Sequence, residues 1–302
     1  MAIQTVMIIG GSGFLGTQLA LSLREKYKVF ATYHSRPYSL PGVTYVPLIL
    51  DNKNWIKRLM YTTKPDVILY ALGSNSLAHS EKYPKLSESL HSIGPASLTS
   101  IHEIASPRFI FLSSPYVFDG LKGNYGETDP TAPQTRLGKF KLGGENMSKS
   151  KFINFLIIRS SPLYGRGTPW NPSYLDYLRM SLTKGKTVEA SSQEIHSFAP
   201  ITHFCDFIHQ VIESEARGKI IHYGGLTKLS TFEFAREFAK RFKFDPALVL
   251  PKKTLPHMTG TQDELTYDFS VNSSRAVQTL KIKPLLLEQG FDLIEQDLIS
   301  TL

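Results

Sequence analysis

The fold is decided by one segment, Thr5-Val6-Met7-Ile8-Ile9-Gly10-Gly11-Ser12-Gly13-Phe14-Leu15-Gly16. A short apolar run leads into closely spaced glycines, and a helical pattern over Phe14–Glu25 follows directly. Strand, glycine loop and helix in this order are typical of a dinucleotide-binding unit. The early glycines permit a tight turn close to a pyrophosphate, and Gly16 lets the helix pack on the strand. The helix N-terminus offers N–H groups to phosphates. The predicted cofactor contacts here are Gly10, Gly13, Phe14, Leu15 and Gly16.

The rest of the first half alternates short apolar runs with helical stretches, which is typical of a parallel sheet covered on both faces. Further strands are predicted at Lys28–Thr32, Tyr45–Pro47, Val67–Ala71, Phe109–Leu112 and Phe155–Arg159. Further helices are predicted at Asn54–Tyr61, Leu86–Ala105 and Lys139–Ser150. We therefore expect an α/β fold in which residues 1–160 form an NAD(P)-binding Rossmann domain with a doubly wound parallel sheet.

After Ser160 the alternation loosens, and proline, glycine and serine become more frequent. Helices near Tyr174–Lys184 and Thr231–Phe242 stand among short strands. Residues 161–302 are expected to form a smaller α+β substrate-binding domain, whose late strand near Ile220–Tyr223 returns to the main sheet.

The segment after the second strand bears on the choice of cofactor. A carboxylate about 20 residues beyond the glycines would grip the ribose 2′-hydroxyl of NAD. The segment reads Thr32-Tyr33-His34-Ser35-Arg36 and has none. Arg36, together with His34, is suited to the 2′-phosphate of NADP, because a guanidinium pairs well with phosphate. A solvated loop arginine is the alternative. We favour NADP over NAD, and include Ala71, at the end of a strand, among the cofactor contacts.

Composition narrows the class of partner. The 302 residues carry a net charge of +8, but the lysines are scattered and no nucleic-acid module accompanies them. A basic surface that receives phosphate-bearing small molecules explains the charge. No apolar run approaches the ~18 residues of a membrane helix, and Val6–Ile9 indicates a strand rather than a signal peptide. A single cysteine, Cys205, fits a reducing cytoplasm. We expect a cytoplasmic protein without a metal site, nucleic acid or membrane as partner.

Several later segments resemble one family. Leu112-Ser113-Ser114-Pro115-Tyr116-Val117-Phe118-Asp119-Gly120 is similar to a Ser-Thr-Asp-Tyr-Val-Phe-Asp-Gly block, and Lys141–Glu145 to a Lys-Leu-x-Gly-Glu block. Both blocks are typical of the dTDP-4-dehydrorhamnose reductase group of extended short-chain dehydrogenases/reductases. Arg159, His222–Gly225 and Ser230–Ala235 also resemble segments of that group, so the likeness covers nearly the whole chain.

The resemblance implies roles for individual residues. In this group a Ser or Thr positions the substrate carbonyl, a tyrosine donates its proton, and a lysine four residues later holds the ribose. By position the hydroxyl is Ser114 and the lysine is Lys141, but the tyrosine position is Leu137. None of the 14 tyrosines has a lysine four residues downstream. Asp51 stands where the group has an acidic residue at the adenine, although a turn residue is an equally good interpretation.

The missing tyrosine leaves three hypotheses open. His91 and Pro115 also depart from the group, where an asparagine and an aspartate are usual. Tyr116 and Tyr125 are the candidates to replace the acid. The first hypothesis is an NADP-dependent reductase of a 4-keto sugar nucleotide, or a related sugar-nucleotide enzyme, with a rearranged acid. The second is a degenerate dinucleotide-binding regulatory or scaffold subunit, like the regulatory β subunit of methionine adenosyltransferase. The third is a structural protein that has lost the cofactor. A homodimer or a complex with a partner enzyme is compatible with each.

Overall fold

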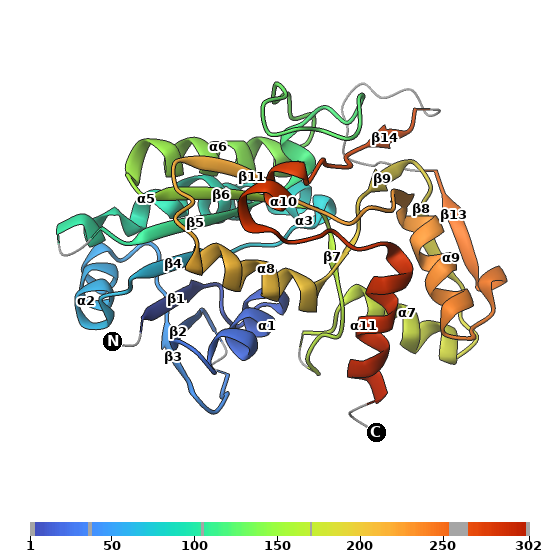
Figure 1. Cartoon of the computed structure of the whole chain (residues 1–302), viewed down its shortest axis with the longest axis horizontal. Helices are drawn as coiled ribbons and strands as arrows, with labels where there is room; N and C mark the ends of the chain where they lie inside the picture. The colour runs from blue at the N-terminus through green and yellow to red at the C-terminus, as the bar shows by residue number, and fades with distance from the viewer. Residues whose placement is uncertain (1–3, 36–37, 104–105, 170, 254–264, 300–302) are drawn as a thin grey trace.

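The computed structural model of the chain describes residues 4–35, 38–103, 106–169, 171–253 and 265–299. Its centre is a seven-stranded sheet with the order β11-β6-β5-β4-β1-β2-β3, in which every neighbouring pair is parallel (Figure 1). The strands are β1 (Thr5–Ile9), β2 (Lys28–Tyr33), β3 (Val43–Pro47), β4 (Val67–Tyr70), β5 (Arg108–Ser113), β6 (Phe155–Ser160) and β11 (Lys219–Tyr223). This order is that of a Rossmann-type doubly wound sheet, so the predicted fold class is confirmed.

Helices cover both faces of this sheet. On one face, α1 (Phe14–Leu23) and α8 (Ile201–Glu213) bury a shared apolar cluster. On the other face, α2 (Lys53–Thr63) packs on the sheet through a second cluster, and α6 (Arg136–Lys151) lies beside β5. Because neither face meets water, the strands are apolar at nearly every position instead of alternating. In β1, the four residues from Val6 to Ile9 are fully buried.

The predicted continuous helix over Leu86–Ala105 is wrong, and Ala105 lies outside the described residues. The segment instead begins inside α4 (Pro84–Glu88), which follows α3 (Leu77–Lys82). It continues as a π-helical turn (Ser89–Ile93), α5 (Gly94–Ser97) and a 3-10 turn (Leu98–Glu103). The Tyr70 hydroxyl donates to the carbonyl of Leu90 at 2.6 Å. The Gly94 N–H bonds one residue further back, to Ser89, as in a π-turn. Tyr70 from β4 therefore bonds a carbonyl within the break, and Pro95, which has no N–H to donate, also interrupts the helix there.

Residues after Ser160 form shorter elements around their own apolar cluster, to which Phe198, Phe234, Phe238 and Phe291 contribute. They include α7 (Tyr174–Thr183), α9 (Thr231–Arg241), α11 (Leu287–Ile299) and η4 (Pro246–Leu248). The helix α10 (Ser274–Leu280) instead buries Ala276 and Leu280 in the cluster shared by α1 and α8. The short strands are β7 (Leu163–Tyr164), β8 (Val188–Ser191), β9 (Glu194–His196), β10 (Ala199–Pro200), β12 (Leu229–Ser230), β13 (Val249–Lys252) and β14 (Tyr267–Asp268). The sequence pattern predicted α7 and α9 but neither α8, α10 nor α11. Among the described residues, no helix has both the length and the apolarity to cross a membrane.

Candidate functional site

The glycine loop lies where the strand order of the sheet reverses, between β1 and β4. Ligands of open α/β sheets bind beyond the carboxyl ends of the strands at such a point. Gly10 has a φ of +91°, and a Cβ there would lie 2.9 Å from the carbonyl oxygen of Ala71. A Cβ at Gly16 would lie 2.1 Å from the carbonyl oxygen of Gly10. The turn is therefore too tight for side chains, and the loop after β4 borders it directly.

The loop presents the start of α1 to a ligand. The Gly10 N–H donates to the Thr32 hydroxyl at 2.9 Å, which fixes the loop to β2. Gly13 is the N-cap of α1, and no side chain caps the helix there. The first N–H groups of a helix have no partner within the helix, so Phe14 and Leu15 open an anion-binding end. Both side chains are half-buried, so this end lies at the surface of the core.

Two residues predicted to contact the adenosine part of the cofactor follow neighbouring strands of the sheet. His34 follows β2 and Asp51 follows β3, and both are exposed. Because β2 and β3 are parallel neighbours, their carboxyl ends point to the same side. Arg36 lies outside the described residues.

Ser114 directly follows β5 and is 3% exposed. Its Oγ has no hydrogen-bond partner among the described residues. A buried hydroxyl without a partner costs about 1–3 kcal/mol. An unpartnered buried group needs an explanation, and one explanation is that the hydroxyl contacts a bound ligand.

Lys141 lies on α6 with its side chain 4% exposed. Its Nζ donates to the carbonyl oxygen of Leu112 at 2.9 Å. Burial lowers the pKa of this amine to about 7, although the neighbouring carboxylate of Glu145 acts in the opposite direction. The resemblance predicts that Lys141 and Ser114 belong to one site. In the structure the Nζ of Lys141 bonds the backbone of Leu112, two residues before Ser114.

Leu137 lies one helical turn before Lys141 on α6, so the two share a face. Its side chain is fully buried and belongs to a cluster with Tyr116, Tyr267 and Phe269. The position therefore offers packing and no proton donor.

Tyr116, the first candidate to replace the acid, has its hydroxyl turned toward β9. It donates to the carboxylate of Glu194, and Nε2 of His196 lies 2.7 Å from the same carboxylate oxygen. Burial raises the pKa of Tyr116 well above its usual value, and Glu194 adds to this rise. Burial alone would raise the pKa of Glu194, but the bonds from His196 and Tyr116 leave it lowered. Sequence reasoning missed this cluster, although Glu194 and His196 are two residues apart and so share one face of a strand.

The hydroxyl of Tyr125, the second candidate to replace the acid, is also hydrogen-bonded to a carboxylate. Its hydroxyl donates to the carboxylate of Asp119, and its ring stacks on Phe118 at 4.1 Å. Burial and the bond to Asp119 raise the pKa of Tyr125 to about 12. In this structure neither tyrosine hydroxyl is directed to Ser114.

His91 lies in the π-turn and is fully buried. Its Nε2 lies 3.1 Å from the carbonyl oxygen of Ser74, and its Nδ1 has no partner among the described residues. Gly73 has a φ of +97°, and a Cβ there would lie 2.3 Å from the imidazole. Burial lowers the pKa of His91 well below its ordinary value, and Lys141 adds to this effect. The imidazole is therefore neutral beside Lys141.

A buried ion pair between Arg159 and Glu145 lies next to the candidate site. Arg159 on β6 donates to the two carboxylate oxygens of Glu145 at 2.8 and 2.7 Å, and the Ser113 hydroxyl donates to the same carboxylate at 2.7 Å. The arginine is 2% exposed and the glutamate 0%. This network joins β5, β6 and α6, the elements that carry Ser114 and Lys141. In the described ranges, no group of three or more His, Cys, Asp or Glu side chains is arranged to hold a metal ion.

Comparisons with known proteins agree with this geometry. The family model of the RmlD substrate binding domain matches residues 4–264. A probable low-salt glycan biosynthesis reductase, Agl14 of Haloferax volcanii, is 28% identical over 185 residues, 60% of this chain and 61% of that protein. Methionine adenosyltransferase 2 subunit beta of Danio rerio is 21% identical over 266 residues, 85% of this chain and 80% of the relative.

Among solved structures, dTDP-4-dehydrorhamnose reductase of Bacillus anthracis str. Ames in complex with NADP has a TM-score of 0.83 at 19% identity. The match covers 98% of this chain and 100% of that one, and at this identity it shows a shared fold. The chain spans about three fifths of the length of the first curated relatives that it matches.

Proposed function

This chain belongs to the RmlD substrate binding domain family, in the dTDP-4-dehydrorhamnose reductase-like group of short-chain dehydrogenases/reductases, and we propose that it binds NADP(H) and a sugar nucleotide. The observation that carries the proposal is the glycine loop at the switch point of the sheet. Its backbone leaves no room for side chains at Gly10 and Gly16, and its helix end has no side-chain cap. These features fit a pyrophosphate, which needs close backbone approach and free N–H donors.

The remaining cofactor contacts follow from the same frame. Gly10, Gly13 and Gly16, with Phe14 and Leu15, would hold the pyrophosphate, and Ala71 borders the loop from β4. His34 and Arg36 would take the 2′-phosphate that distinguishes NADP, and Asp51 would take the adenine. Lys141 would hold the nicotinamide ribose. The Bacillus anthracis reductase of the same fold was solved with NADP, which supports this choice of dinucleotide.

The proposed reaction is reduction of a 4-keto sugar nucleotide, for which bound NADPH supplies the hydride. Reduction builds negative charge on the carbonyl oxygen, and a donor must meet it. In this proposal the Ser114 hydroxyl, which has no partner among the described residues, would donate a hydrogen bond to that oxygen, whereas Leu137 can donate nothing. Loss of a general acid costs about 10²–10⁴ in rate, while positioning of the reactants persists. We therefore expect slow turnover rather than that of an efficient reductase.

A second candidate function is a dinucleotide-binding regulatory subunit without turnover. The observation in its favour is Leu137, which is sealed in an apolar cluster with Tyr116, whose own hydroxyl is bound to Glu194. The similarity to methionine adenosyltransferase 2 subunit beta, a protein named as a subunit of another enzyme, supports this candidate. Both candidates require the same cofactor loop, so they differ only in turnover.

The first experiment is a fluorescence titration of the purified chain with NADPH and with NADH. We expect binding of both with clear preference for NADPH, and loss of that preference in Arg36→Ala. Failure of both cofactors to bind would overturn the proposal and leave a structural protein as the interpretation. Binding without turnover of any keto-sugar nucleotide, in the native chain and in Leu137→Tyr alike, would favour the regulatory subunit.

A further inference from the structure

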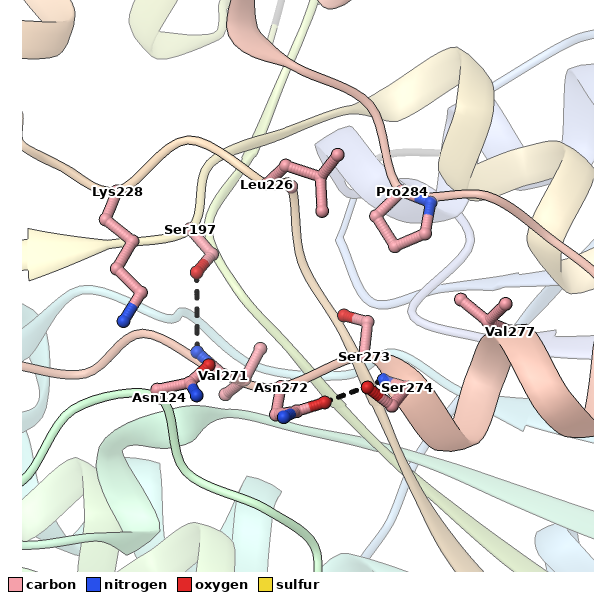
Figure 2. A pocket seen from close by; sticks show the side chains of 11 residues that line it. Asn124, Ser197, Leu226, Lys228, Val271, Asn272, Ser273, Ser274, Val277 and Pro284 are labelled. Carbon is pink, nitrogen blue, oxygen red and sulfur yellow. Dashed lines mark hydrogen bonds between the residues drawn. The ribbon is translucent and has the colours of Figure 1, made fainter.

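A second hollow, which we call the β11 cavity, lies beyond the end of β11 and beside α10 (Figure 2). Its volume is about 250 Å³. It is lined by Asn124, Ser197, part of the loop 225–228, the turn 271–274, Val277 and Pro284. No residue assigned above to cofactor binding lines this cavity, and neither Ser114 nor Lys141 does. The proposed cofactor site therefore leaves the cavity unexplained.

Backbone hydrogen bonds hold the walls of the β11 cavity in place. The Gly225 N–H donates to the Ser197 carbonyl at 2.9 Å, and the Asn272 N–H donates to the Tyr125 carbonyl at 2.8 Å. Ser197 also accepts from the Val271 N–H through its hydroxyl at 3.4 Å (Figure 2). These bonds join four segments that are far apart in sequence. The cavity is therefore preformed, as small-molecule sites usually are.

One side of the β11 cavity is rich in hydrogen-bond donors and carries a positive charge. Lys228 and Asn124 lie there, and no carboxylate lines the cavity or pairs with Lys228 among the described residues. Asn272 accepts the Ser274 N–H with its side-chain oxygen at 2.8 Å, so its amide N–H groups stay available (Figure 2). An ammonium and two carboxamides, with no carboxylate in the cavity lining, favour an oxyanion, since charge-assisted bonds to it are the strong ones.

The opposite side of the β11 cavity is apolar. Leu226, Val277 and Pro284 gather there, away from Lys228 in Figure 2. Leu226 is 57% exposed and Val277 is 37% exposed, so their side chains keep apolar surface in water. A ligand with a short apolar part would remove that surface from water, which favours binding.

We propose that the β11 cavity binds a small organic anion, with its carboxylate or phosphoryl group at Lys228 and its apolar part against Leu226 and Val277. The cavity is smaller than the roughly 300–1,000 Å³ of typical ligand pockets, so the ligand is small. The proposal stands apart from the proposed cofactor site, because it shares no residue with the cofactor loop.

The test uses saturation-transfer NMR and calorimetric titration on the full chain with three probes: isovalerate, isobutyl phosphate and inorganic phosphate. Isovaleramide, the neutral counterpart of isovalerate, is the matched control ligand. We expect millimolar or tighter binding of an organic anion, and the tighter of isovalerate and isobutyl phosphate identifies the head group. Equal binding of isovaleramide, or no binding of any probe, overturns the proposal. Binding of inorganic phosphate alone also overturns it, because the apolar side would then play no part.

Two variants locate the bound anion. Lys228→Gln removes the charge at an exposed position and should weaken binding of the organic anion roughly tenfold. Lys186→Gln, at an exposed lysine outside the cavity, is the control and should leave binding unchanged. Both variants should bind NADPH like the native chain, so failure of the cofactor proposal is distinguishable. Equal anion binding by Lys228→Gln and Lys186→Gln would place the anion elsewhere and refute the site.

Discussion

Replacing Lys141 by methionine should make the protein more stable near neutral pH while weakening NADPH binding. The amine is 4% exposed, and burial lowers its pKa from 10.5 to about 7. Methionine has a similar length and no charge to bury, so the substitution removes the cost of desolvation and keeps the packing. The same substitution removes the group proposed to hold the nicotinamide ribose. A gain in stability with a loss of binding would identify Lys141 as a residue kept for function.

The pH dependence follows from proton linkage. The unfolded chain holds the proton of Lys141 up to a pKa of 10.5, whereas the folded chain releases it near 7. Between these values the unfolded state binds more protons, so the stability of the native chain rises with pH. One proton sets a maximum slope of about 1.4 kcal/mol per pH unit. Below pH 7 both states are protonated and the lysine is at its most destabilising.

The assay is urea unfolding of the native chain and of Lys141→Met at several pH values. The stability advantage of Lys141→Met should fall as pH rises from about 7 to about 9, by roughly 1 kcal/mol per unit. Lys139→Met, at an exposed position on the same helix, should show no such trend. An advantage that stays constant over this range would refute the burial argument, as would a variant less stable than the native chain at pH 7.

Three further substitutions test other parts of the structure. Gly16→Ala places a Cβ 2.1 Å from a backbone oxygen, so the loop must shift and NADPH titration should show at least a tenfold weaker affinity. Glu145→Ala leaves the buried guanidinium of Arg159 without its carboxylate and should cost about 3–5 kcal/mol in urea unfolding. Tyr116→Phe removes one partner of the buried Glu194 and should cost about 1–3 kcal/mol. Its NADPH affinity should stay unchanged, and a large loss there would contradict a purely structural hydroxyl.

The parts of the fold that follow from local chemistry could be predicted from the sequence. The glycine loop was recognisable because its spacing, the preceding strand and the following helix all express one local requirement, close approach of the backbone. The central strands were recognisable because burial on both faces requires continuous apolar runs, as in Val6–Ile9. Both features depend on neighbours along the chain, which the sequence displays directly.

Features that depend on distant residues could not be predicted. Pro95 is a local signal for a break in the predicted helix, but the bond from Tyr70 to the Leu90 carbonyl is not, because nothing near Leu90 in sequence indicates that contact. The bond between Tyr116 and Glu194 spans 78 residues and joins β9 to the end of β5. Sequence position identified Tyr116 as a candidate acid, but only the tertiary structure shows that its hydroxyl serves a buried carboxylate. The sequence can thus single out a tyrosine without revealing which group its hydroxyl contacts.

Two buried polar groups in the candidate site lower the stability of the fold, and this bears on whether the chain still uses a ligand. Ser114 keeps a buried hydroxyl that finds no partner in the part of the chain that the structure describes, and Lys141 keeps a buried amine with a lowered pKa. Each lowers stability, and apolar residues of similar size would relieve both. Leu137 shows that this relief is sterically feasible, because an apolar side chain at the tyrosine position is fully buried among aromatic rings. A structural protein needs neither cost, whereas both a slow reductase and a regulatory subunit need Lys141 for the cofactor. Only the reductase would also use the Ser114 hydroxyl, at the substrate carbonyl, so turnover of the native chain against that of Ser114→Ala separates the two candidates.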